Sequence, residues 1–209
     1  MHSSRSPSIA FAVIANATTV LSLMAVLLAH RDEAARELER LAMVDALTGV
    51  LNRGAWMTRA ATEMAVSVRY RHPVAVLMID LDHFKQINDS HGHDAGDRAL
   101  SFIARALQAA VRPGDLVGRY GGEEFCVLMT HADNAAASAF DTRMRTYLTE
   151  VAERELGFPL AYSAGIAMRT SPDDTLAAMV KRADATLYSA KEQGRSRTLD
   201  AQGLRLRPA

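Results

Sequence analysis

Two glutamates beside two glycines are the residues of this sequence with the clearest chemical use. The segment Gly121-Gly122-Glu123-Glu124 stands between two apolar runs, which is the pattern of a hairpin tip. Glycine allows backbone turns that are closed to other residues and lets a ligand approach closely. Carboxylates are hard oxygen ligands that suit Mg²⁺, an ion that usually shares its coordination with substrate phosphates. The alternative at this point is an ordinary hairpin turn with solvated acids.

A second acidic segment follows the apolar run Val74 to Ile79, which we expect to be a buried strand. Asp80 and Asp82 come directly after this run, and in an extended chain they point to the same face. If this strand neighbours the hairpin, its first aspartate and the glutamate pair converge, and the carboxylates repel one another unless a cation joins them. Lys85 adds a positive charge suited to phosphate oxygens. The alternative is a strand end followed by a solvated loop.

Polar residues farther along the chain have the chemistry to recognise a nucleotide. Asn88 and Asp97 flank a glycine-containing loop, and an amide and a carboxylate match the donors and acceptors of a guanine edge. Their alternative role is helix capping. Lys191 and Arg195 are one helical turn apart near a helix end, where cations are favoured, and plain solvation is the alternative. No Walker-type glycine loop is present, so phosphates would be held by metal and basic side chains.

The elements that must position these residues alternate between helix and strand. The pattern predicts the order helix, strand, helix, hairpin, helix, strand, helix, which is typical of a ferredoxin-like α+β sandwich with helices packed on a mostly antiparallel sheet. The expected helices cover residues 52–71, 94–111, 133–155 and 173–193, and the expected strands cover 74–79, 116–119, 125–130 and 161–168.

The N-terminal part has a different character. The run from Ile9 to Ala29 carries no charge, and as a helix rising about 1.5 Å per residue it reaches about 30 Å, the thickness of a bilayer core. We expect a transmembrane helix; a signal peptide and a buried helix of a soluble protein are the alternatives. Arg31, Arg36 and Arg40 follow the run, whereas Arg5 alone closely precedes it. This asymmetry predicts a single pass through the inner (cytoplasmic) membrane with the C-terminal part in the cytoplasm.

Composition sets further bounds. Lys plus Arg and Asp plus Glu both number 24, so no net charge indicates a nucleic-acid surface. The single cysteine, Cys126, excludes a disulfide framework and is expected to be a buried structural thiol. The charged stretch after the apolar run suits a linker helix that could pair as a short coiled coil. The expected organisation is an anchor over 1–30, a linker helix over 31–44, a globular domain over 45–200 and a tail over 201–209.

From about Val44 to Arg197 the sequence resembles the GGDEF family of diguanylate cyclases, whose fold is the nucleotidyl cyclase palm. Six ordered motifs make this resemblance more specific than the glycine-glutamate signature alone. They are Asp45 to Arg53, Asp80 to Asp89, Gly92 to Asp97, Gly121 to Phe125, Ser163 to Ala167 and Ala183 to Arg195. The departures, Val50 and Ser196, do not touch the expected chemistry.

The resemblance implies an activity and a set of site residues. The family condenses two GTP molecules into cyclic di-GMP and releases pyrophosphate, with one GTP on each domain of a homodimer. Glu123 is implied to accept the proton of the 3′-hydroxyl, and Lys85 to stabilise charge on the phosphates. The implied ligands of Mg²⁺, or of Mn²⁺ in its place, are Asp80, the carbonyl of Leu81, Glu123 and Glu124. The implied nucleotide contacts are Asn88, His93 and Asp97, with Lys191 and Arg195 on the terminal phosphates.

A further match to the family concerns regulation. Arg112-Pro113-Gly114-Asp115 has the RxxD form of the family's product-inhibition site, where the arginine and aspartate bind cyclic di-GMP, and Arg143 is implied as a second contact. The alternative is an ordinary turn with a surface ion pair. For the whole domain, a non-catalytic cyclic di-GMP receptor, a purely structural dimerisation module and a cyclase for another nucleotide remain as alternatives. The intact signature favours the enzyme.

Overall fold

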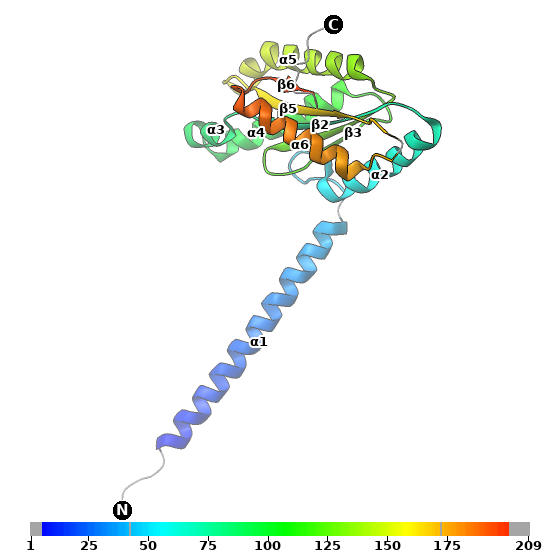
Figure 1. Ribbon diagram of the computed structural model, residues 1–209. Coiled ribbons are helices and arrows are strands. Elements are labelled where there is room, and N and C mark those ends of the chain that lie inside the picture. Colours follow the sequence, from blue (N-terminus) through cyan, green and yellow to red (C-terminus); the bar gives the residue numbers. More distant parts are fainter. Residues whose placement is uncertain (1–5, 42, 172, 201–209) are drawn as a thin grey trace, which may run out of the picture. The chain divides into compact units, whose positions relative to one another are not determined.

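The computed structural model of this chain describes residues 6–41, 43–171 and 173–200. The chain divides into two compact units, residues 1–42 and residues 43–209. The first unit contains helix α1, Ser6–Leu41, which runs without a break through the boundary expected between anchor and linker (Figure 1). Met43 and Val44, the last residues of the expected linker, lie outside the helix. The expected tail, 201–209, lies outside the described residues.

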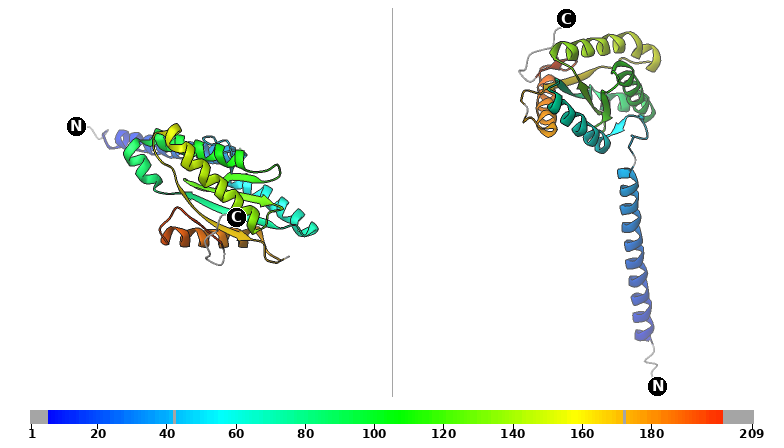
Figure 2. Two further views of the ribbon diagram at one scale, coloured as in Figure 1. Left: turned by 90° about the horizontal axis from the view of Figure 1, so that it is seen from above. Right: turned by 90° about the vertical axis from the view of Figure 1, so that its right-hand side faces the viewer.

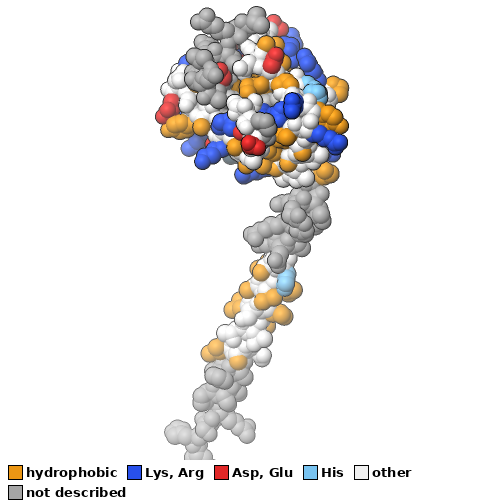
Figure 3. Space-filling view, turned by 45° about the vertical axis from the view of Figure 1, so that its right-hand side comes forward, with side chains coloured by type: hydrophobic (Ala, Val, Ile, Leu, Met, Phe, Trp, Pro, Cys, Tyr) orange, Lys and Arg blue, Asp and Glu red, His pale blue; other side chains and the backbone are white. Residues whose placement is uncertain are grey.

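Helix α1 exposes an apolar surface. Its stretch Ile14–Arg31 is long and apolar enough to cross a membrane, and none of that stretch is buried within the chain (Figure 3). Leu21, for example, is 66% exposed. The hydroxyls of Thr18 and Thr19 donate to the carbonyl of Ala15 at 2.9 and 2.8 Å, so they are satisfied within the helix. Core helices of soluble proteins and signal sequences pass the same test of length and composition.

The second unit is built on a six-stranded sheet with the order β1-β3-β4-β2-β5-β6. The strands are β1 Leu51–Asn52, β2 Val74–Leu81, β3 Leu116–Arg119, β4 Glu124–Thr130, β5 Tyr162–Met168 and β6 Thr198–Leu199. The four central strands are antiparallel, and with their helices they follow a β-α-β-β-α-β succession. The edge strands β1 and β6 pair in parallel with β3 and β5. The sheet is therefore mixed: the expected antiparallel pairing holds for the four central strands, and the two edge strands pair in parallel.

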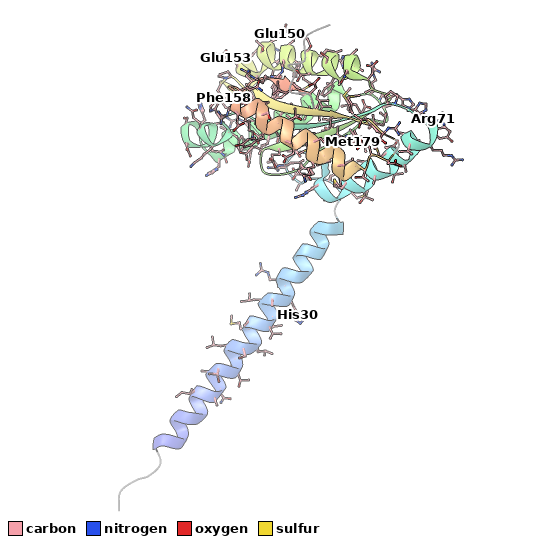
Figure 4. The ribbon with its side chains drawn as sticks, in the orientation of Figure 1. His30, Arg71, Glu150, Glu153, Phe158 and Met179 are labelled. Atoms are coloured by element: carbon pink, nitrogen blue, oxygen red, sulfur yellow. The ribbon has the colours of Figure 1, made fainter. Side chains whose placement is uncertain are left out.

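Helices cover both faces of this sheet (Figures 1 and 2). They are α2 Arg53–Tyr70, α3 Phe84–His91, α4 His93–Ala110, α5 Asn134–Leu156 and α6 Leu176–Glu192. Leu77 and Ile79 of β2 pack against α4 and α5 in one core cluster. Val76 and Met78 pack with α2 and α6, including the buried Met179 labelled in Figure 4, in the other. Because both faces of β2 are covered, its sequence is a continuous apolar run.

Local signals account for most of the helix boundaries. The side chains of Asn52, Asp133 and Thr175 each accept a hydrogen bond from a backbone N–H in the first turn of α2, α5 and α6. Arg71, labelled in Figure 4, takes a left-handed conformation with φ of 57° where α2 ends. The predicted helices and central strands are confirmed to within a few residues. Cys126 is confirmed as a buried free thiol, and burial raises the pKa of this group.

The sequence prediction omitted α3 and the two edge strands. Residues 84–91 read as a polar loop because Phe84 and Ile87, both half-buried against the core, are their only large apolar side chains. Strands β1 and β6 have two residues each, so their pairing with distant strands defines them rather than any local pattern.

Candidate active site

The signature residues form the tip of the hairpin between β3 and β4. The N–H groups of Tyr120 and Gly121 both donate to the carbonyl of Glu124, at 2.7 and 3.3 Å. A Cβ atom on Gly121 would collide with the carboxylate of Glu124. Glycine at this position therefore leaves the space in which the glutamate side chain lies.

An arginine that the sequence reasoning gave no role holds this tip in place. Arg119 donates from Nε and Nη2 to the carbonyl of Gly122, at 3.0 and 2.7 Å. Its Nη1 lies 3.1 and 3.2 Å from the two carboxylate oxygens of Asp45. Asp45 Oδ1 also accepts from the N–H and the hydroxyl of Thr48, at 2.9 and 2.6 Å. One guanidinium thus joins the turn that opens the domain to the signature tip.

The pKa of Asp45 reflects these contacts. Burial alone would raise the pKa of this carboxyl, but the hydrogen bonds from Thr48 and the charge and hydrogen bond of Arg119 outweigh burial and lower it. The lowered pKa keeps the aspartate charged at neutral pH, and the two side chains are only partly exposed, at 23% for Asp45 and 18% for Arg119. Nη1 alone reaches both Asp45 oxygens, while Nε and Nη2 are used by the carbonyl of Gly122, so the planar guanidinium fixes the aspartate relative to the tip.

The predicted neighbours Asp80 and Glu124 face each other across β2 and β4 in the sheet register. Asp80 is buried, with 7% of its surface exposed, and Lys191 Nζ lies 2.8 Å from its Oδ2. Burial raises the pKa of Asp80; the ion pair with Lys191 opposes this, and the charges of Glu123 and Asp82 add to it. Burial and the charge of Asp80 likewise raise the pKa of Glu124. This corner of the domain therefore carries more negative charge than its own lysine neutralises.

The expected convergence of three carboxylates on one cation is incomplete in this structure. Among the residues that the structure describes, no three His, Cys, Asp or Glu side chains form a group that could hold a metal ion. Lys191 lies against Asp80 here, while the charges of Glu123 and Asp82 also act on this carboxyl. The corner nevertheless fits Mg²⁺, which is usually bound by one or two carboxylates together with phosphates. Leu81 lies beside the tip, since its N–H donates to the carbonyl of Glu123 at 3.3 Å.

Helices α3 and α4 carry the residues expected to bind guanine. A Cβ atom on Gly96 would collide with Oδ1 of Asn88, so this glycine makes room for the half-buried amide. Asp97 is the next residue on α4 and lines a cavity of about 310 Å³. His93 is the exposed first residue of α4, and Lys85 is exposed in the first turn of α3. Asn88 therefore lies against Gly96, the residue before Asp97, but the cavity that Asp97 lines does not include Asn88; His93 and Lys85 are exposed.

The basic residues of the C-terminal motif lie at the end of α6 and in the turn that follows. Lys191 is in the last turn of the helix, and the N–H of Arg195 donates to the carbonyl of Ala190 at 3.1 Å. The next N–H, that of Ser196, donates to Oδ2 of Asp82 at 2.9 Å. The turn after α6 is therefore attached to the end of β2, next to the carboxylate that contacts Lys191.

The RxxD motif forms a turn at the other end of β3. The backbone N–H of Arg112 donates to Oδ2 of Asp115 at 3.0 Å, while Oδ1 accepts from the N–H of Thr130 at 2.8 Å. The aspartate therefore holds the turn through backbone groups, and the Arg112 side chain is exposed. Arg143 is exposed on α5. The four residues of β3, about 13 Å of extended chain, separate this motif from the signature.

Comparison with known proteins gives the class to which this fold and site belong. The profile of the family described as "Diguanylate cyclase, GGDEF domain" matches residues 42–197. The chain therefore belongs to the GGDEF family. It is similar to the probable diguanylate cyclase DgcC of Escherichia coli K12, with 37% identity over 166 residues covering 78% of this chain and 44% of that protein.

Other relatives carry the same domain. The diguanylate cyclase DgcP of Pseudomonas aeruginosa is 38% identical over 158 residues, covering 75% of this chain and 23% of that protein. The solved active GGEEF domain of a diguanylate cyclase from Vibrio cholerae is 30% identical, with a TM-score of 0.67 and coverage of 76% of this chain and 98% of that one. The GGDEF domain of DgcB from Caulobacter crescentus, solved in complex with cyclic di-GMP, is 27% identical, with a TM-score of 0.71 and coverage of 77% and 93%. This chain spans less than half the length of these two curated relatives.

Proposed function

We propose that this protein is a diguanylate cyclase, which condenses two GTP molecules into cyclic di-GMP and releases pyrophosphate. The observation that carries the proposal is the acidic corner at the signature hairpin, where Asp80 faces Glu124 and Lys191 lies 2.8 Å from Asp80. Carboxylates for a cation and a lysine for phosphate are what phosphoryl transfer between nucleotides requires. The relatives named as diguanylate cyclases support the same reaction.

The chemistry assigns a role to each residue of the corner. The 3′-hydroxyl of each GTP attacks the α-phosphorus of the other, so in each of two steps a 3′-oxygen–phosphorus bond forms, the bond from the α-phosphorus to the bridging oxygen breaks, and one pyrophosphate leaves. Glu123 accepts the hydroxyl proton, and Lys85 stabilises the charge on the phosphates. Mg²⁺, or Mn²⁺ in its place, supplies charge neutralisation and lowers the pKa of the hydroxyl when it is bound. Its ligands are Asp80, the carbonyl of Leu81, Glu123 and Glu124.

Nucleotide selection is assigned to residues of α3 and α4. Asn88 and Asp97 recognise the guanine edge, because an amide and a carboxylate around Gly96 match its donors and acceptors. His93, exposed at the start of α4, contacts the nucleotide. Lys191 and Arg195 hold the terminal phosphates.

The reaction needs two copies of the domain. Each holds one GTP, so two domains must face each other in a symmetric pair, and correct placement of two reactants is worth about 7–11 kcal/mol of barrier.

We infer that α1 anchors the chain in the inner membrane by a single pass, with the GGDEF domain in the cytoplasm. The exposed apolar side chains of Ile14–Arg31 support this role. The domain organisation is then an anchor over 1–30, a linker over 31–44, the cyclase over 45–200 and a tail. Arg112 and Asp115, with Arg143, form the proposed product-inhibition site.

The test is the synthesis of cyclic di-GMP by the full chain. Purified in a mild detergent and supplied with Mg²⁺ and GTP, the protein should form cyclic di-GMP, measured by chromatography and mass spectrometry. Glu123→Gln should lower turnover by about 10²–10⁴-fold, the usual contribution of a general base, and leave the fold intact. Failure of the wild type to form product even when dimerisation is enforced by a fused coiled coil would refute the proposal.

A further inference from the structure

Asp82 is a buried carboxylate to which the proposed chemistry gives no role. It lies directly after β2, and only 6% of its surface is exposed. Its Oδ1 accepts from the hydroxyl of Ser163 at 2.7 Å, and its Oδ2 accepts from the backbone N–H of Ser196 at 2.9 Å. Its own N–H donates to the carbonyl of Ala161 at 2.9 Å. One side chain therefore connects the end of β2, the start of β5 and the turn after α6.

The turn that Asp82 holds has an unfavourable backbone conformation. Arg195 and Ser196 have φ values of 59° and 48°, and Gly194 before them has 102°. Side-chain-bearing residues rarely adopt this left-handed region, and two in succession need outside contacts to stay there. The carbonyl of Ala190 accepts from Arg195 on one side, and Asp82 accepts from Ser196 on the other. The carbonyl of Arg195 also accepts from Nε of Arg197 at 3.0 Å, so among these hydrogen bonds the one from Ser196 to Asp82 ties the backbone of Arg195 to the end of β2.

The two aspartates at the end of β2 contact different parts of the basic motif that contains Lys191 and Arg195. Asp80 contacts Lys191 directly, and Asp82 contacts the residue that follows Arg195. This spacing explains an observation that the sequence alone raised, namely two acids on the same face of a strand end. Building on the proposed function, we propose that Asp82 is a positioning residue that fixes Arg195 for contact with the terminal phosphates of the bound nucleotide. Asp82 itself does not touch the nucleotide in this assignment.

The assignment predicts a selective loss of affinity. Asp82→Ala frees the left-handed turn, so affinity for 3′-deoxy-GTP, which cannot react, should fall about tenfold, the size expected for one charge-assisted hydrogen bond to phosphate. Affinity for GMP, which lacks the terminal phosphates, should change less than about twofold. Asp82→Asn can still accept from Ser196 through its oxygen and donate to the Ser163 hydroxyl through its amide. It should therefore bind 3′-deoxy-GTP within about threefold of the wild type.

Calorimetric titration of the full chain in detergent with Mg²⁺ measures these affinities, and the fluorescence of the buried Trp56 reports the fold. The matched comparison is Arg195→Ala. If Asp82 acts through Arg195, the double variant should bind 3′-deoxy-GTP no more weakly than the weaker single variant. Three results would each overturn the assignment. The first is a double variant whose loss of affinity is the product of the two single losses, and the second is an equal loss of affinity for GMP and 3′-deoxy-GTP in Asp82→Ala. The third is an Asp82→Asn variant that binds 3′-deoxy-GTP as weakly as Asp82→Ala.

Two further controls keep the test decisive. If the wild-type chain binds neither nucleotide, the result counts against the proposed function. If the wild type binds both, and the losses of affinity in the two single variants multiply in the double variant, the result counts against the role of Asp82. If Asp82→Ala does not fold, Asp82→Ser takes its place, because a serine hydroxyl is too short to reach both Ser163 and Ser196. The same selective loss for 3′-deoxy-GTP is then expected, and its absence overturns the assignment.

Discussion

Adding one methyl group at Gly165 tests how tightly the fold fixes the position of α6. Gly165 lies in β5 and pairs with Met78 of β2. A Cβ atom here would collide with the carbonyl oxygen of Ala183 and the nitrogen of Leu187, and it would lie 2.9 Å from the carbonyl carbon of Thr186. All three are backbone atoms of α6, so no side-chain rotation relieves the contact. The helix must move away from the sheet.

The size of the effect follows from this geometry. Overpacking a well-filled core usually costs about 1–3 kcal/mol, and the backbone contacts place Gly165→Ala at the upper end, about 3 kcal/mol. For a domain of this size, 1 kcal/mol lowers Tm by about 2–4 °C, so we expect a drop of about 6–12 °C. The displaced helix also carries Lys191 away from Asp80, and we therefore expect cyclase activity to fall even at temperatures where the variant is folded.

Thermal unfolding of the full chain, followed by Trp56 fluorescence, provides the measurement. Trp56 is the single tryptophan of the sequence, is fully buried and belongs to the core cluster that contains Met179 and Leu187 of α6. The matched control is Gly122→Ala, because a Cβ atom there meets no atom within 4 Å. This control should stay within about 0.5 kcal/mol of the wild type. A Gly165→Ala variant that melts together with the control would refute the reasoning.

Three other changes probe separate contacts. Arg119→Lys keeps the charge, but a single ammonium cannot replace both the forked contact with the Gly122 carbonyl and the contact with Asp45, so it should destabilise the domain by about 1.5–3 kcal/mol and reduce turnover at least about tenfold; unchanged turnover in the cyclase assay would contradict this. The raised pKa of Glu124 means that its charged form weakens the fold at neutral pH. In EDTA at pH 7.5, Glu124→Gln should therefore be more stable than wild type by about 0.2–1 kcal/mol in urea unfolding, and this advantage should vanish below the ordinary glutamate pKa of 4.5. A constant difference across pH would argue against charge repulsion. Arg112→Ala should abolish inhibition by added cyclic di-GMP without changing the initial rate, and unaltered inhibition would remove that site from the proposal.

The elements that the sequence predicted are those with strong local signals. The continuous apolar run of β2 and the paired runs around the signature define a buried strand and a hairpin without any tertiary information. Helix α3 has too few apolar residues to show a helical period in its sequence. It is stabilised by Phe84 and Ile87, which pack against the core. The residue before the helix, His83, also adopts a left-handed backbone conformation with φ of 58°, and no sequence pattern predicts this conformation.

Some contacts of the candidate site could likewise be predicted from the sequence, and others could not. The facing of Asp80 and Glu124 could be predicted, because the order of elements makes their strands neighbours. The ion pair of Lys191 with Asp80 could not, since it depends on where α6 crosses the sheet. Asp82 was also beyond prediction, because its partner is a backbone N–H located 114 residues away, and every residue type except proline offers that donor.

The contact between Arg119 and Asp45 has a consequence for control of the domain. Asp45 lies two residues after Met43, the first residue of the second unit, and its carboxylate is one guanidinium away from the carbonyl of Gly122. A twist or pull applied to the chain at this point reaches the signature hairpin without passing through the hydrophobic core.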